Sequence, residues 1–96
     1  IEPQEGVVLI NSGDLLERWT NGRYKSTPHR VKPITSGRDR FSIAFFVDPD
    51  SEVEVNVLES CISAEVPRKY SSVKAGDYIR GRLERSHIGL SSDLKK

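Results

Sequence analysis

Three polar residues in the middle of the sequence carry the side chains best suited to chemistry. His29 lies in a segment expected to form a strand, and Arg40 and Ser42 lie two residues apart in the next one. Because successive side chains of a strand point to opposite faces, Arg40 and Ser42 are expected on the same face. A guanidinium grips both oxygens of a carboxylate and a hydroxyl adds a third hydrogen bond, so this pair suits a carboxylate ligand. The neutral imidazole of His29 is a common type of metal ligand.

The residue types alone leave simpler roles open. A lone histidine on a strand is more often a structural residue than a metal ligand. Arg40 can equally form an exposed ion pair with Asp39 or Asp48, worth about 0–1 kcal/mol. Spacing alone does not decide between these roles and a ligand site.

The elements expected to position these residues are a strand, a short helix, three more strands and a C-terminal helix. Apolar runs and alternation predict strands over 6–10, 23–31, 41–47 and 53–58, and helices over 15–19 and 77–85. A turn over 35–38 would fold the second and third strands as a hairpin, which brings His29 towards the face of Arg40. Half of a sandwich or barrel is expected rather than a whole one, because the strands leave open edges.

Turn residues set the expected ends of these elements. Asp14 or Ser12 is expected to cap the short helix, and Asn21-Gly22 to end it, because Asn and Gly tolerate a left-handed backbone. A loop is predicted over 67–75, and the polar residues 91–96 are expected to fray.

Composition excludes several classes of function. The 96 residues suffice for a single domain or fragment (1–96, core about 6–85), and no apolar run approaches the roughly 20 residues of a membrane span. The net charge of +1 offers no general attraction to nucleic acid, and the arginines of 80–85 are interleaved with acidic residues, as on a solvated helix face. The single cysteine, Cys61, fits a reducing compartment, so a cytoplasmic location is expected.

Longer stretches of the sequence carry a family resemblance. Residues 13–31, Gly-Asp-Leu-Leu-Glu-Arg-Trp-Thr-Asn-Gly-Arg-Tyr-Lys-Ser-Thr-Pro-His-Arg-Val, resemble the stretch around the second metal histidine of isopenicillin-N-synthase-like 2-oxoglutarate/Fe(II)-dependent dioxygenases. Arg40-Phe41-Ser42 and the apolar strand after it resemble that family's Arg-x-Ser strand. The segments Pro67-Arg68-Lys69-Tyr70 and Ala75-Gly76-Asp77-Tyr78 resemble the sequence that follows this strand in the family.

The resemblance implies a fold, cofactors and site residues. The fold would be mainly β, the C-terminal portion of a double-stranded β-helix, or jelly roll, with a short helix and a C-terminal helix. His29 would bind Fe(II), and Arg40 and Ser42 would bind the distal carboxylate of 2-oxoglutarate. The reaction would oxygenate a small organic substrate and release succinate and CO₂. Two histidines and one carboxylate hold the iron in such enzymes, and the opposite face stays open for cosubstrate and oxygen.

The sequence departs from the family at one point. The family's His-x-Asp ligand pair is absent, because neither His29 nor His87 is followed by an acidic residue two places on. The sequence also contains no methionine; removal of an initiator residue would explain this, but the resemblance to part of a family favours a chain cut from a longer protein. We therefore expect this chain to be inactive alone, and its partner to be the missing N-terminal half of the barrel or a second copy of itself. The alternative is a noncatalytic β-rich interaction module derived from the family.

Overall fold

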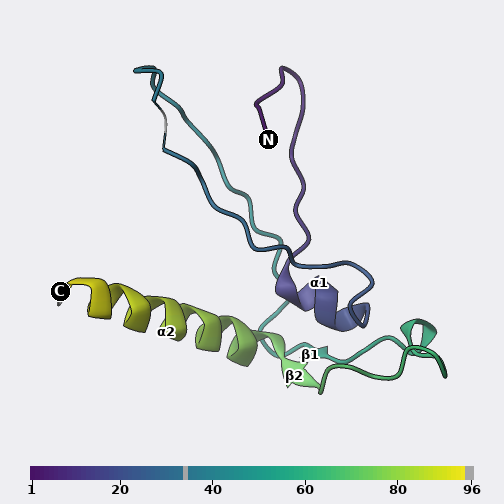
Figure 1. Ribbon diagram of the computed structural model, residues 1–96. Helices are drawn as coiled ribbons and strands as arrows, with labels where there is room; N and C mark the ends of the chain where they lie inside the picture. Colours follow the sequence, from purple (N-terminus) through teal and green to yellow (C-terminus); the bar gives the residue numbers. More distant parts are fainter. Residues whose placement is uncertain (34, 95–96) are drawn as a thin grey trace. The chain divides into compact units, whose positions relative to one another are not determined.

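The computed structural model describes residues 1–33 and 35–94, with side chains up to residue 86. Its elements are α1 (Asp14–Trp19), β1 (Glu54–Val55), a short 3₁₀ helix (Glu59–Cys61), β2 (Val73–Lys74) and α2 (Ala75–Leu94), as Figure 1 shows. The chain forms two compact units. Unit 1 combines Ile1–Thr27 with Asn56–Ser71, and unit 2 combines Pro28–Val55 with Ser72–Lys96.

Helix α1 of unit 1 ends in a Schellman motif. The N–H of Gly22 donates to the carbonyl of Glu17 at 2.8 Å, and the N–H of Asn21 donates to Arg18 at 3.2 Å. Asn21 has a φ of 54° and Gly22 a φ of 82°, so the predicted left-handed turn is confirmed. The predicted cap at the other end is wrong: Gly13 is the N-cap and no side chain caps the helix, because Asp14 already lies inside the first turn.

The second segment of unit 1 packs against the end of α1. The N–H of Leu58 donates to the carbonyl of Trp19 at 2.9 Å, which joins the two segments through their backbones. Val57 beside it is buried, as are Thr20 and Asn21. Most of this small core therefore comes from the C-terminal end of α1, where the chain reverses.

Unit 2 is organised around the start of α2. Strands β1 and β2 pair antiparallel, with Val55 opposite Val73, and Val55 is buried. The first N–H groups of α2 are satisfied from outside the helix: Ala75 donates to Val53 and Gly76 donates to Ser51, both at 2.9 Å. A helix begins here because the preceding loop supplies acceptors that a helix start otherwise lacks.

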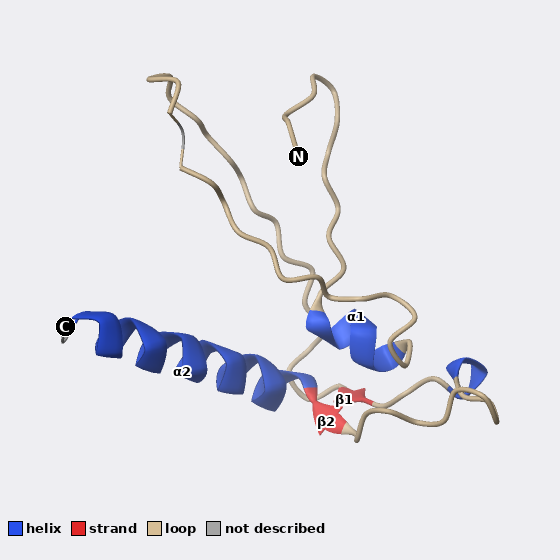
Figure 2. Cartoon of the chain, viewed as in Figure 1, coloured by secondary structure: helices blue, strands red, loops and turns tan. Residues whose placement is uncertain are grey.

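The described residues show only part of the mainly β architecture expected from the sequence, with β1 and β2 as their strands. Strands were predicted over 6–10, 23–31, 41–47 and 53–58, but within the described residues only Glu54–Val55 of these stretches is a strand. Figure 2 draws the other three stretches as loop. The physical reason is pairing: an extended segment becomes a strand only beside a hydrogen-bonding neighbour, and these segments have none among the described residues.

Residues 28–33 and 35–48 belong to the longest of these loop stretches. Figure 1 shows an outgoing segment, a reversal, and a returning segment, defined here as residues 38–48. Gly37 lies at the reversal with a φ of 70°. The predicted turn is therefore present. The prediction of a β-hairpin is wrong, since no backbone hydrogen bond is described between the outgoing and the returning segment.

Two further boundaries differ from the expected ones. Strand β2 lies inside the predicted loop 67–75, because its partner β1 is 18 to 20 residues away and leaves no local signal. Helix α2 covers 75–94 rather than 77–85, so residues 91–94 are helical instead of frayed. In the described part of the chain, no helix combines the length and apolar character needed to cross a membrane.

Candidate functional site

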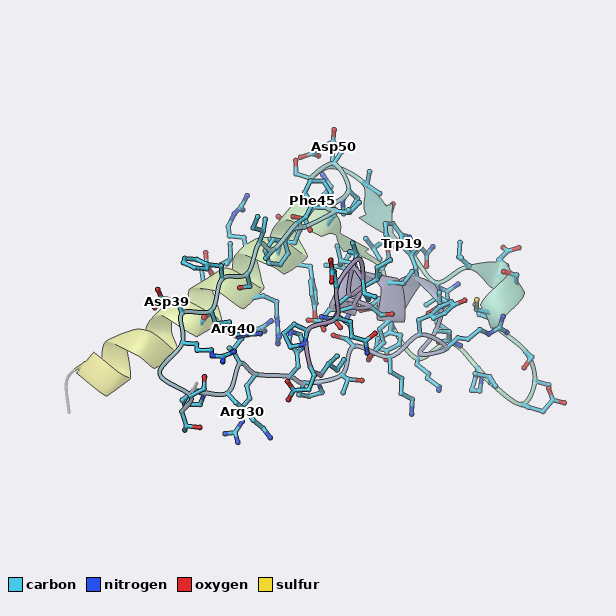
Figure 3. All side chains as sticks on the ribbon, turned by 90° about the horizontal axis from the view of Figure 1, so that it is seen from above. Trp19, Arg30, Asp39, Arg40, Phe45 and Asp50 are labelled. Carbon is cyan, nitrogen blue, oxygen red and sulfur yellow. The ribbon has the colours of Figure 1, made fainter. Side chains whose placement is uncertain are left out.

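The three residues selected from the sequence all lie on the 28–48 loop of unit 2. His29 is on the outgoing segment, Arg40 and Ser42 are on the returning segment, and all three are exposed. Figure 3 shows the side chains of Arg40 and Phe45 on the returning segment. The structure does not gather the three residues into a described cavity.

The structure removes one alternative for Arg40. No ion pair joins Arg40 to Asp39 or to Asp48; the ion pairs described are Lys74–Glu52 at 3.0 Å and Arg80–Asp77 at 3.7 Å. The guanidinium of Arg40 therefore has no acidic partner among the described residues and keeps all its donors for a ligand.

A complete metal site does not fit the described residues. Among residues 1–33 and 35–86, no three His, Cys, Asp or Glu side chains lie close enough together to hold an ion. Iron of the kind that the sequence suggests needs two histidines and a carboxylate on one face. His29 has the right donor chemistry for one of these positions, and no reaction step can be derived through iron on these residues alone.

The segment that leads to His29 is fixed by a carboxylate of α1. Glu17 accepts hydrogen bonds from the backbone N–H of Ser26 and from the hydroxyl of Tyr70, the latter at 2.9 Å. These two donors favour the charged form and hold the pKa of Glu17 below its ordinary value of 4.5. Ser26 lies three residues before His29 in the sequence, and this clamp fixes the end of the first segment of unit 1.

Arg18 adds a second attachment at the same place. Its guanidinium carbon lies 5.3 Å from the centroid of the Tyr70 ring, and its Nη2 donates to the carbonyl of Ser71 at 2.8 Å. A cation over a ring face is attracted by the ring quadrupole, worth about 0.5–1 kcal/mol at an exposed site. Tyr70 is therefore held at its hydroxyl by Glu17 and at its face by Arg18.

Asn21 organises the rest of unit 1. Its side-chain amide donates to the carbonyls of Cys61 at 3.1 Å and Pro67 at 3.0 Å, and its oxygen accepts from the N–H of Lys69 at 2.8 Å. The side chain is fully buried. Sequence reasoning placed Asn21 at the end of the helix but assigned it no role in the site, because its place before a glycine predicts a turn and not these bonds.

A cavity of about 270 Å³ lies in unit 1 beside this network. It is lined by Thr20, Asn21, Gly22, Arg23, Ser60, Cys61, Ile62, Ser63, Val66 and Lys69. None of the three predicted site residues contributes to it. The side-chain amide and oxygen of Asn21 are already used in hydrogen bonds to Cys61, Pro67 and Lys69.

Known proteins resemble this chain over most of its length. The sequence model of the 2OG-Fe(II) oxygenase superfamily matches residues 1–49. Kihadalactone A synthase of Citrus sinensis is 36% identical over 99% of this chain and 28% of its own length. A 2-oxoglutarate-Fe(II) type oxidoreductase of Emericella nidulans is 37% identical over the whole chain and 27% of its own length.

A solved structure shares the fold of much of the chain. A 2OG-Fe(II) oxygenase family protein from Caulobacter crescentus superposes with a TM-score of 0.68 and 38% identity, over 76% of this chain and 25% of that one. The chain thus spans about a quarter of the length of the relatives that it matches. The family match over residues 1–49 includes His29, Arg40 and Ser42. This chain belongs to the 2OG-Fe(II) oxygenase superfamily.

Proposed function

We propose that this chain supplies part of the active site of an Fe(II)- and 2-oxoglutarate-dependent dioxygenase that oxygenates a small organic substrate. The observation that carries the proposal is the family match over 1–49, because it spans all three candidate site residues in one stretch. Fe(II) and 2-oxoglutarate would supply the oxidation in the assembled enzyme, with one atom of O₂ going to the substrate and the other to succinate as 2-oxoglutarate loses CO₂.

Arg40 and Ser42 are assigned to the distal carboxylate of 2-oxoglutarate. Their chemistry supports this, because a guanidinium binds a carboxylate through two parallel N–H groups and a neighbouring hydroxyl adds a third donor. Neither side chain is engaged in an interaction with another described residue. The pair would bind and orient the cosubstrate and would take no part in proton transfer.

His29 is assigned to one metal position, with the imidazole as a neutral ligand. The remaining histidine and carboxylate would come from outside this chain, because its 96 residues contain no His-x-Asp pair. The N-terminal half of a barrel would supply them as a His-x-Asp pair, whereas a second copy of the chain would have to supply a histidine and a carboxylate that are not so spaced. In that assembly the chain is the C-terminal portion of a double-stranded β-helix, and the loops 6–10, 23–31 and 41–47 become strands. A cytoplasmic location accompanies this proposal, from the single cysteine.

Anaerobic titration of the chain with Fe(II) and 2-oxoglutarate tests whether the site is incomplete. The iron chelate of 2-oxoglutarate has a weak visible charge-transfer band, and the variants Arg40→Ala and His29→Ala are run beside the parent chain. We expect no band from the chain alone, since one protein ligand holds Fe(II) poorly.

If the charge-transfer band does appear, its behaviour in the two variants decides which part of the proposal is wrong. If it is lost with Arg40→Ala and His29→Ala, the residue assignments stand and the chain recruits its missing ligands by itself, so the claim of an incomplete site is wrong. If it survives both substitutions, the chelate forms without these residues and their assignment is wrong.

A further inference from the structure

The cavity of unit 1 is bordered by cationic and hydroxyl-bearing residues and by no acidic one. Its volume is about 270 Å³, and the ten residues that line it include Arg23, Lys69, Ser60 and Ser63 but no aspartate or glutamate. All ten belong to unit 1. The lining of the cavity therefore carries a surplus of positive charge, which favours an anion of small-molecule size.

Hydrogen bonds within the chain join the walls of this cavity. The side chain of Asn21 ties the end of α1 to the carbonyls of Cys61 and Pro67. The turn that begins at Ser63 is closed twice: its N–H donates to the carbonyl of Val66 at 2.9 Å, and its Oγ accepts from the N–H of Val66 at 3.0 Å. The cavity thus arises from contacts that the chain makes with itself and not from an unpaired strand edge.

Arg23 and Lys69 are available to a ligand. Within residues 1–33 and 35–86, the described ion pairs involve neither residue, and no described hydrogen bond uses a side-chain nitrogen of either. A Cβ built on Gly22 would stand 3.5 Å from Nζ of Lys69, so the ammonium lies against this glycine. Because Gly22 also lines the cavity, the ammonium lies at the cavity wall.

Carbonyl oxygens beside the cavity are engaged and do not oppose an anion. Those of Thr20 and Val66 accept from the N–H groups of Arg23 and Ser63, at 3.0 and 2.9 Å. The last carbonyls of α1 are engaged by its Schellman motif. The hydroxyl of Ser63 accepts from Val66 and keeps its proton to donate. A guanidinium, an ammonium and a hydroxyl are therefore the donors that the wall offers to a ligand.

We propose that this cavity binds the phosphate group of a small phosphate monoester, with Arg23, Lys69 and Ser63 as the donors. Such a group carries about −1.5 to −2 charges at neutral pH and presents three acceptor oxygens. Two cations and a hydroxyl match this charge and this number of oxygens, whereas a carboxylate offers one charge and two oxygens. Ile62 and Val66 supply apolar lining for the organic part of the ester.

This site is independent of the proposed oxygenase role. His29, Arg40 and Ser42 do not line the cavity, and all three belong to unit 2. Loss of phosphate binding in variants of the cavity residues therefore tests this site alone, and titration with 2-oxoglutarate tests the other.

Titration of the isotope-labelled chain with glycerol phosphate, followed by nuclear magnetic resonance, tests the proposal. We expect saturable amide shifts at Gly22, Ser63 and Lys69. The dissociation constant should rise about tenfold in Arg23→Gln and in Lys69→Gln, because each substitution removes one charge-assisted contact. Lys25→Gln is the matched control, since it removes an exposed cation of the same segment that does not line the cavity. Arg23 and Lys69 are exposed, so both variants should fold, and their amide spectra report this.

Inorganic phosphate and succinate are titrated beside the ester. Inorganic phosphate should shift the same amides, more weakly than the ester if the organic part is held and equally if the phosphate group is the whole ligand. Binding of both phosphates that Arg23→Gln and Lys69→Gln weaken and Lys25→Gln leaves unchanged supports the site. The proposal is overturned if no saturable shift appears, if succinate binds as tightly as the ester, or if Lys25→Gln weakens binding as much as Lys69→Gln.

Discussion

The side-chain oxygen of Asn21 accepts a hydrogen bond from the backbone N–H of Lys69 at 2.8 Å, across 48 residues of sequence. Asn21 is also the residue at which α1 ends in a left-handed turn, with a φ of 54°. Asn21 thus lies at the point where the chain reverses, and its side chain bonds this turn to the loop that contains Lys69. The candidate metal ligand His29 follows eight residues later in the sequence, in unit 2.

Asn21→Ala is expected to destabilise unit 1 by about 2–4 kcal/mol. The substitution leaves the N–H of Lys69 and the carbonyls of Cys61 and Pro67 without partners, and Ala adopts the left-handed backbone of this position less readily than Asn does. Trp19, the single tryptophan, adjoins this region and reports its unfolding by fluorescence in urea. Asn21→Gly keeps the backbone conformation, so a smaller loss separates strain from hydrogen bonding. A loss below about 0.5 kcal/mol for Asn21→Ala would contradict this role.

Tyr70→Phe isolates the hydroxyl bond to Glu17. It removes the 2.9 Å hydrogen bond and keeps the ring beneath Arg18, so we expect a loss of about 1 kcal/mol in the free energy of unfolding. Tyr70→Leu also removes the ring and should cost about 0.5–1 kcal/mol more. If Phe and Leu are equally destabilising, the ring contact with Arg18 contributes nothing measurable.

Acid should weaken the clamp made by Glu17. Its pKa is lowered in the folded chain by the N–H of Ser26 and then by the hydroxyl of Tyr70. As the pH falls, the unfolded chain takes up the proton first, near the ordinary value of 4.5. The stability that Glu17 contributes is therefore full above that value and is lost as the pH falls through the lower, folded pKa.

Glu17→Gln provides the control for this pH dependence. It keeps one oxygen to accept from Ser26 and an amide to face the Tyr70 hydroxyl, but it does not titrate. The free energy of unfolding of the parent chain should exceed that of the variant at neutral pH, and the gap should close in acid. If the difference in free energy of unfolding between the two proteins is the same at pH 6 and pH 3, the charge of the Glu17 carboxylate does not contribute to stability.

Two glycines of α2 should respond in opposite directions to the same substitution. A Cβ on Gly76 would lie 2.7 Å from the Cβ of Ser51 and 3.1 Å from its carbonyl oxygen, so Gly76→Ala should cost about 1–3 kcal/mol. A Cβ on Gly81 meets nothing within 4 Å, so Gly81→Ala should gain about 0.5–1 kcal/mol. Thermal unfolding followed at the helical circular dichroism signal measures both. A stabilising Gly76→Ala would mean that the Ser51 loop does not close on α2.

Local signals in the sequence predicted local features well. Asn21-Gly22 predicted the end of α1 and its left-handed backbone, because both depend only on neighbouring residues. The alternation over 53–58 predicted a half-exposed strand: Val55 and Val57 are buried and Glu54 and Asn56 are exposed, but the strand covers only Glu54–Val55. The predicted strand over 41–47 was wrong for this chain, because a strand is completed by a partner that no local pattern specifies.

For the candidate site, too, the sequence identified individual residues but not the long-range contacts around them. His29, Arg40 and Ser42 were selected by residue type, spacing and resemblance, and the structure neither assembles them nor engages Arg40 elsewhere. The attachments around them were not predictable. Glu17 meets Tyr70 across 53 residues and Asn21 meets Pro67 across 46, and single-sequence patterns hold no signal for contacts at such separations.

The most direct test of the oxygenase account is 2-oxoglutarate binding to this chain followed by nuclear magnetic resonance. The account predicts shifts at Arg40 and Ser42, and a dissociation constant that rises about ten- to a hundredfold in Arg40→Ala, the worth of a charge-assisted hydrogen bond. Arg38→Ala is the matched control, since it removes an exposed arginine of the same segment and should leave binding unchanged. Equal losses from Arg38→Ala and Arg40→Ala, or binding that survives both, would contradict the assignment of Arg40 as the carboxylate-binding residue.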